Sequence, residues 1–67
     1  MTHVQLALIS PAEQKVLDLL LEGDTNRSIA KQLVLSTRTV ESHVSNLLLK
    51  TGSRNRTQLL LWAMKRR

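Results

Sequence analysis

Cysteine is missing from this chain of 67 residues, and Trp62 is its single Phe, Trp or Tyr residue. The absence of cysteine excludes disulfide bonds and thiolate metal sites. One aromatic ring is too few for a stacking surface that binds single-stranded nucleic acid. The two histidines, His3 and His43, lie far apart in the sequence and have no ligand-like spacing to carboxylates. A bound zinc ion is therefore not expected.

Long hydrophobic runs are also missing. None approaches the roughly 20 residues of a membrane-spanning helix, and the short apolar stretch near the N-terminus has no basic region ahead of it, which makes it a poor signal peptide. The sequence shows no nucleophile–base pair, no glycine loop for phosphate and no two carboxylates at a recognisable spacing. We therefore expect a cytoplasmic protein that is not an enzyme, uses no cofactor, binds no small-molecule ligand and stays off membranes.

Acidic residues are scarce in the second half of the chain. Residues 1–35 carry three Lys or Arg and four Asp or Glu, whereas residues 36–67 carry seven Lys or Arg and only Glu41 as an acid. The total net charge of +5 is thus concentrated in the second half. This asymmetry indicates a polyanionic partner, with a merely solvated basic face as the alternative.

The remaining composition, with 42% apolar residues, fits one small globular domain over residues 1–67. Ser10-Pro11-Ala12-Glu13 supplies the cap, the proline and the acid of a capping box, and Gly23 and Gly52 are natural helix stops. We predict an all-α domain without strands. Its four helices are expected to cover about residues 10–22, 26–33, 37–51 and 56–65.

The middle of the chain has the pattern of a helix, a tight turn and a second helix. Thr25 and Ser36 are the expected caps of these two helices, and Leu35 in the turn is expected to enter the core. Two helices joined in this way are typical of a helix-turn-helix, which offers its second helix to a DNA groove. An apolar stripe at helical period on the second helix is formed by Val40, Val44, Leu47 and Leu48.

A second strip of side chains lies opposite this apolar stripe. Arg38 can contact a guanine edge or reach a phosphate, and Glu41 can accept a hydrogen bond from a cytosine amino group. Short serine side chains would let the helix sit deep in a major groove. The strip consists of Arg38, Glu41, Ser42, Ser45 and Leu49. An ordinary solvated helix face is the alternative.

Three helix starts combine a polar cap with an arginine. Unpaired N–H groups and the helix dipole favour an anion at such positions. The three clusters are Thr25-Asn26-Arg27, Ser36-Thr37-Arg38 and Arg54-Asn55-Arg56. We expect them to bind DNA phosphates, unless they are only the polar caps of any helical protein. His43 lies between the two faces of its helix and either packs structurally or contacts DNA.

The last helix is apolar on every side. Asn55 is its expected cap, with Gln58 completing a capping box, and residues 59–64 are apolar without a break. One small core cannot cover every face of such a helix. Part of its surface must therefore meet another molecule or another domain.

An ordered set of segments resembles the DNA-binding domain of LuxR/FixJ-type (GerE-like) regulators over about residues 8–64. The most distinctive segment is residues 39–48, with the sequence TVESHVSNLL. The other matching residues are Ile9 to Glu13, Val16, Leu17, Leu19, Leu20, Glu22, Gly23, Thr25 to Arg27, Ile29, Ala30, Leu33, Leu35, Ser36, Lys50, Gly52, Asn55 to Thr57, Trp62 and Ala63.

This resemblance implies a four-helix domain of a bacterial transcription regulator, which binds double-stranded DNA as a homodimer on paired half-sites with its third helix in the major groove. Such a protein is expected near the nucleoid, with RNA polymerase as a further partner. Base contacts are expected from Glu41, Ser42 and Ser45, with Arg38 as a neighbouring candidate. Phosphate contacts are expected from Thr25, Asn26, Arg27, Ser36, Thr37, Thr39, His43, Lys50, Arg54, Asn55 and Arg56. The dimer contact is expected from Leu60, Leu61, Trp62 and Met64.

Some positions depart from the family pattern. Glu41 stands where lysine is frequent, and Leu49 stands where Arg or Lys is common. Thr51 and Ser53 replace apolar residues, so a looser hinge is expected before the fourth helix. The chain has no room for a receiver or ligand-sensing domain and fits either the C-terminal piece of a larger regulator or a small stand-alone one.

Two other functions fit the composition. The domain could be a protein–protein interaction module that docks its apolar fourth helix, for instance to a polymerase subunit or a membrane protein. Residues 59–67 could also bind an anionic membrane as a basic amphipathic tail. The membrane alternative is weaker because the charges flank the apolar run instead of sharing a helical face with it.

Overall fold

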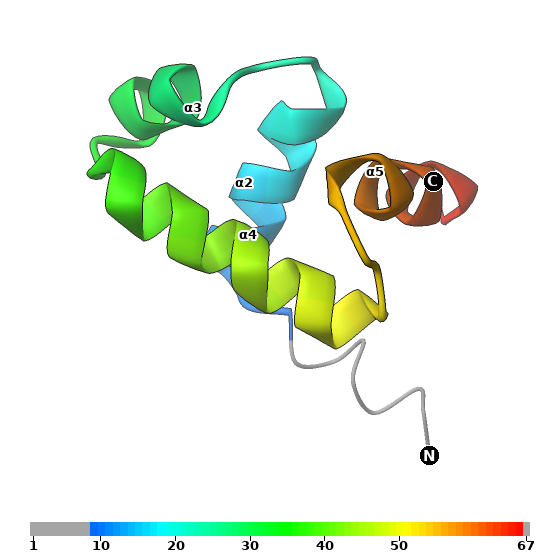
Figure 1. Cartoon of the computed structure of the whole chain (residues 1–67). Helices are drawn as coiled ribbons and strands as arrows, with labels where there is room; N and C mark the ends of the chain where they lie inside the picture. The colour runs from blue at the N-terminus through cyan, green and yellow to red at the C-terminus, as the bar shows by residue number, and fades with distance from the viewer. Residues whose placement is uncertain (1–8, 67) are drawn as a thin grey trace.

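The computed structural model describes residues 9–66, which form four α-helices joined by short turns (Figure 1). No strand is present in this part of the chain. The predicted all-α architecture is confirmed, and each predicted helix boundary lies within one residue of the observed one. The helices are α2 (Pro11–Leu21), α3 (Asn26–Leu33), α4 (Thr37–Thr51) and α5 (Arg56–Lys65).

Side-chain caps fix where each helix begins. At α2 the capping box is complete, because Ser10 Oγ accepts from the Glu13 N–H at 3.1 Å and Glu13 Oε1 accepts from the Ser10 N–H at 3.0 Å. The three other helices are capped by Thr25, Ser36 and Asn55, each of which accepts from the backbone N–H three residues later. Every helix start therefore follows from a local sequence signal.

Of the two hydrogen bonds predicted for the capping box of α5, one is confirmed and the other is wrong. Asn55 Oδ1 accepts from the Gln58 N–H at 2.9 Å, as expected. The Gln58 side chain, however, accepts from the N–H of Arg54 at 2.9 Å and not from that of Asn55. Gln58 therefore bonds the backbone one residue earlier in the chain than a standard capping box does.

All four helices contribute to one core. α2 and α4 pack against each other, and each of them also packs against α3 and α5. In Figure 1, α4 crosses the molecule in front of α2, with α3 near its start and α5 near its end. The buried apolar residues are Val16, Leu17, Leu20, Ile29, Ala30, Val40, Leu47, Leu59 and Ala63.

The predicted burial of Leu35 in the turn between α3 and α4 is wrong, because its side chain is 37% exposed. The preceding Val34 adopts a left-handed conformation, with φ 58° and ψ 49°. This reversal lets the Leu35 N–H donate to the Ala30 carbonyl at 2.8 Å, which is the long bond of a Schellman motif. The motif closes α3, and Leu35 lies at the surface directly after it.

The end of α4 has the same geometry with a glycine. Gly52 has φ 70°, and the Ser53 N–H donates to the Leu48 carbonyl at 2.9 Å. A left-handed conformation is unstrained for glycine but unfavourable for a β-branched residue such as Val34. Val34 is also 89% exposed, so its side chain gains little from packing. The first of these two Schellman turns is therefore strained and the second is not.

None of the helices within residues 9–66 is long and apolar enough to cross a membrane.

We predict that Val34→Gly raises the free energy of unfolding by about 1 kcal/mol, because it removes the left-handed strain and loses almost no packing. Gly52→Ala should lower it by a similar amount, since a Cβ there meets no atom within 4 Å and only the backbone strain changes. Urea unfolding followed by circular dichroism measures both. A lower stability for Val34→Gly would show that the valine side chain makes a contact worth more than the strain.

Candidate nucleic-acid interface

The side of α4 that faces away from the core carries Arg38, Glu41, Ser42, Ser45 and Asn46, which we call the outer strip. All five are exposed, and together they line one shallow groove on the surface. Four of them are the residues predicted to read bases. Asn46 was missed by sequence reasoning, although its spacing of four from Ser42 and eight from Arg38 places it on the same face.

The polar groups of the outer strip have no partner among the residues that the structure describes. None of its side chains makes a hydrogen bond or ion pair with another of residues 9–66, in which Glu13–Lys50 is the only salt bridge. Arg38 and Glu41 therefore do not neutralise each other, although they are three residues apart on one helix. Short hydroxyl side chains lie beside them, which allows a ligand to approach the helix closely.

The opposite side of α4 is anchored in the core. Val40 and Leu47 have no exposed surface. Val44 and Leu48 complete the predicted stripe and are partly buried against the same core. His43 lies at the boundary between the two sides and is half-buried.

The predicted phosphate-binding residues at the starts of α3 and α4 have mixed surroundings. Thr25, Arg27, Ser36 and Thr37 are exposed, whereas Asn26 and Thr39 are half-buried. The hydroxyl oxygens of Ser36 and Thr39 lie 2.9 Å apart, so each already has a polar neighbour. The exposed members remain available to a polyanion at two helix N-termini.

Arg56 at the start of α5 is engaged inside the molecule. Its Nη2 donates to the Asp24 carbonyl at 2.6 Å, and its Nη1 donates to Asn26 Oδ1 at 3.2 Å. α3 and α5 do not pack directly, since no Cα of one lies within 8 Å of a Cα of the other. The half-buried guanidinium therefore bridges these two helices and holds the start of α3 in place. Its neighbours Arg54 and Asn55 are exposed.

Lys50, near the end of α4, also has an internal partner. Its Nζ donates to Glu13 Oε1 at 2.7 Å, and Glu13 is only 4% exposed. Burial raises the pKa of the Glu13 carboxyl, but hydrogen bonds from Lys50 and Ser10 and the charge of Lys50 outweigh burial, so the pKa lies below its ordinary value. This ion pair joins the first turn of α2 to the last turn of α4.

The hinge before α5, expected to be looser than in the family, is held by hydroxyl groups. Thr51 Oγ1 donates to the Leu47 carbonyl at 2.8 Å and lies 2.7 Å from Ser53 Oγ. Two polar residues thus replace apolar packing with hydrogen bonds.

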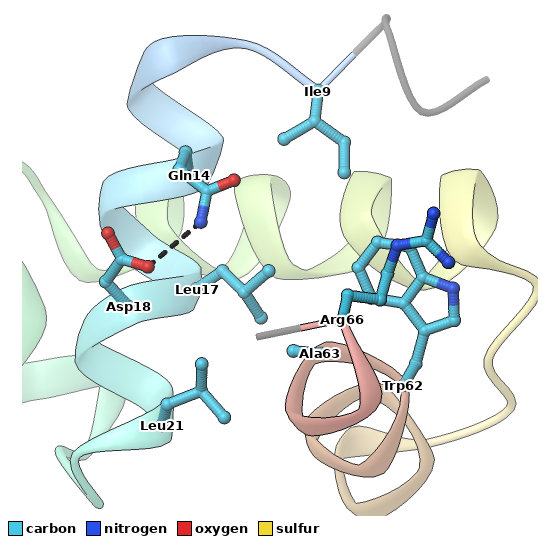
Figure 2. Close-up of a pocket in the computed structure, with 8 residues that line it drawn as sticks. All are labelled: Ile9, Gln14, Leu17, Asp18, Leu21, Trp62, Ala63 and Arg66. Atoms are coloured by element: carbon cyan, nitrogen blue, oxygen red, sulfur yellow. Dashed lines mark hydrogen bonds between the residues drawn. The ribbon is translucent and has the colours of Figure 1, made fainter. Parts of the chain in front are cut away.

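The four residues predicted to form a dimer contact do not share one environment. Leu61 and Met64 are 53% and 60% exposed, whereas Leu60 and Trp62 are partly buried against the core. Figure 2 shows Trp62 at a pocket between α2 and α5, with Arg66 beside it. The central carbon of the Arg66 guanidinium lies 4.8 Å from the centre of the Trp62 ring. Leu61 and Met64 follow a spacing of three and form the exposed apolar face of α5.

A short helix, a tight turn and a longer helix that is buried on one side and polar on the other define a helix-turn-helix domain. The sequence profile described as "Bacterial regulatory proteins, luxR family" matches residues 7–63. The chain therefore belongs to the luxR family of bacterial regulatory proteins. It is a DNA-binding domain that serves transcription regulation.

Named relatives agree with this family. The chain is 46% identical over 61 residues to the "Probable transcriptional regulator ycf29" of Porphyra purpurea, covering 91% of this chain and 29% of that protein. It is 48% identical over 56 residues to the "Response regulator Rre1" of Synechocystis sp., covering 84% and 24%. It is 40% identical over 57 residues to the "CsgBAC operon transcriptional regulatory protein" of Escherichia coli, covering 85% and 26%. The chain thus spans less than a third of the length of these relatives.

We predict that Glu13→Gln lowers the free energy of unfolding at pH 7 by about 2 kcal/mol, between the values for exposed and fully buried ion pairs. Glutamine keeps the capping box, so the change isolates the ion pair. Because the folded-state pKa of Glu13 is lowered, its contribution is complete above the ordinary glutamate pKa of about 4.3 and is lost as the pH falls through the folded-state value.

Thermal unfolding of the wild type and Glu13→Gln at neutral and strongly acidic pH measures this contribution. The difference in melting temperature should vanish in acid. Glu22→Gln, at an exposed position at the end of α2, is the control and should change little at either pH. A constant difference across the pH range would contradict an origin in the Glu13–Lys50 pair.

We predict that Arg56→Lys lowers the free energy of unfolding by about 1–2 kcal/mol, because a lysine cannot donate to two acceptors with the geometry of a guanidinium fork. Arg54→Lys is the matched control, since the exposed Arg54 side chain makes no such bridge. Chemical denaturation compares the two variants. Equal stabilities would mean that the bridge between α3 and α5 does not contribute to the fold.

Proposed function

We propose that this domain binds double-stranded DNA sequence-specifically, with α4 in the major groove. Arg38, Glu41, Ser42 and Ser45 would contact base edges. The observation that carries this proposal is the outer strip itself. It is exposed, its polar groups have no partner among the described residues, and the core stripe on the opposite side of α4 holds it in a fixed orientation.

Phosphate contacts would position the domain on the duplex. The exposed residues Thr25 and Arg27 at α3, Ser36 and Thr37 at α4, and Arg54 and Asn55 at α5 support such contacts at three helix N-termini. Lys50 and Arg56 contribute less directly, because each has an internal partner. Asn26, Thr39 and His43, all half-buried, would complete the phosphate-binding set at its edges.

The apolar face of α5 supports a homodimer on paired half-sites. Leu61 and Met64 would lie at the centre of the contact, with Leu60 and Trp62 at its edges. One short helix buries little area, so this dimer would be weak without DNA or a further domain. The names of the relatives support a place in transcription regulation, where the domain would act in the cytoplasm, at the nucleoid, with RNA polymerase as a further partner.

We predict a strong salt dependence of DNA binding. If each monomer neutralises about 3 phosphates, a dimer neutralises about 6, and the slope of log K against log salt is near −5, at roughly −0.9 per phosphate. Fluorescence anisotropy with a labelled random duplex measures this slope. A slope near zero, or no binding at low salt, would overturn DNA binding and favour a protein-docking module that uses α5.

Two charge-matched variants separate the outer strip from net charge when anisotropy is measured with a duplex that carries a binding site selected from a random pool, because a base contact is not reported by random sequence. Arg38→Ala should weaken binding more than tenfold while circular dichroism stays unchanged, because Arg38 is exposed and makes no internal bond. Lys15→Ala removes the same charge from an exposed position on α2 and should have a much smaller effect. Equal effects would indicate that only the total charge matters.

A further inference from the structure

Glu41 is the one acidic residue among residues 36–67, and it lies in the middle of the outer strip. It is exposed and forms no ion pair with any described residue, even though Arg38 is one turn away. A carboxylate at this position is repelled by the phosphates on both sides of a groove. Unless the duplex itself supplies a hydrogen-bond donor, Glu41 therefore opposes binding.

Only one base edge in the major groove suits a carboxylate. Cytosine presents its amino group as a donor without an adjacent acceptor, whereas adenine places the N7 acceptor beside its amino group. Guanine presents two acceptors, and thymine presents an acceptor and a methyl group. A carboxylate thus finds a lone donor only on cytosine, a donor beside an acceptor on adenine, and no donor on guanine or thymine.

The spacing of Arg38 and Glu41 along α4 indicates how far apart their base contacts would lie on the duplex. Three residues advance about 4.5 Å along a helix, and successive base pairs are separated by about 3.4 Å. Arg38 suits the two acceptors of guanine. The two side chains would therefore reach neighbouring base pairs.

We propose that Glu41 is a specificity-determining residue that selects cytosine, in the base pair next to the guanine contacted by Arg38, mainly by excluding other bases and non-specific DNA. The inference rests on the proposed DNA-binding function and adds the chemistry of the half-site to it. Glu41 lowers the affinity for random duplex and raises the contrast between the correct half-site and all others.

The test starts with binding sites selected by the wild-type domain from a random duplex pool. Each selected half-site should contain one position at which cytosine is required next to a guanine. Replacing that cytosine by thymine should weaken wild-type binding about tenfold. Selected half-sites without such a cytosine would overturn the inference, while strong salt-dependent binding would leave the proposed function intact.

Glu41→Gln tests the residue directly, since glutamine has the same shape without the charge. Because glutamine pairs with the N6 and N7 groups of adenine, the preferred base at this position should change from cytosine to adenine. Affinity for random duplex should rise severalfold. Glu22→Gln, exposed at the end of α2, makes the same change in net charge and should keep the cytosine preference.

The possible outcomes distinguish a failure of the Glu41 role from a failure of DNA binding. If Glu41→Gln keeps the cytosine preference, or if both variants raise random-duplex affinity equally, the role of Glu41 is refuted and DNA binding stands. If the wild type binds no duplex at low salt, both proposals fail. Circular dichroism shows whether the variants fold. If Glu41→Gln does not fold, the cytosine-to-thymine replacement with the wild-type domain still tests the role of Glu41.

Discussion

The structure depends on a division of α4 into two sides. Val40 and Leu47 are fully buried, while every residue of the outer strip is exposed. The helical period of 3.6 residues makes this division possible only if the other helices cover one side alone. α2, α3 and α5 meet this condition, because all three pack against the buried side of α4 (Figure 1). The core thus determines which residues the domain presents to a ligand.

Two long-range polar contacts secure this arrangement at its ends. Glu13–Lys50 ties the start of α2 to the end of α4, and Arg56 ties the start of α5 to the start of α3. Both contacts involve basic residues expected at a phosphate. Their internal use fits the small size of the core, since a domain of this length buries little apolar surface and gains from each satisfied ion pair or hydrogen bond.

The helices and the outer strip could be predicted because their signals are local. Caps at Ser10, Thr25 and Ser36 and stops at Gly23 and Gly52 act within one turn, and the face of a helical residue follows from its spacing. The partners of Lys50 and Arg56 could not be predicted, since they lie 37 and 32 residues away in the sequence. The exposure of Leu35 could not be predicted either, because the left-handed conformation of the preceding Val34 has no sequence signal, which a glycine would supply.

The same internal contacts affect how many basic side chains are available to DNA phosphates, and therefore the balance between affinity and specificity. The charge of residues 36–67 suggests many phosphate contacts, yet Lys50 and Arg56 are engaged internally and Arg66 lies over Trp62. Exposed arginines remain at three helix starts, Arg27 at α3, Arg38 at α4 and Arg54 at α5, and the backbone N–H groups at these positions add to the attraction for phosphate. With an unpaired carboxylate in the outer strip, a single domain would bind random DNA weakly. A dimer on two half-sites would then bind tightly only where both outer strips contact their preferred bases. Weak binding by each single domain would thus make the dimer selective.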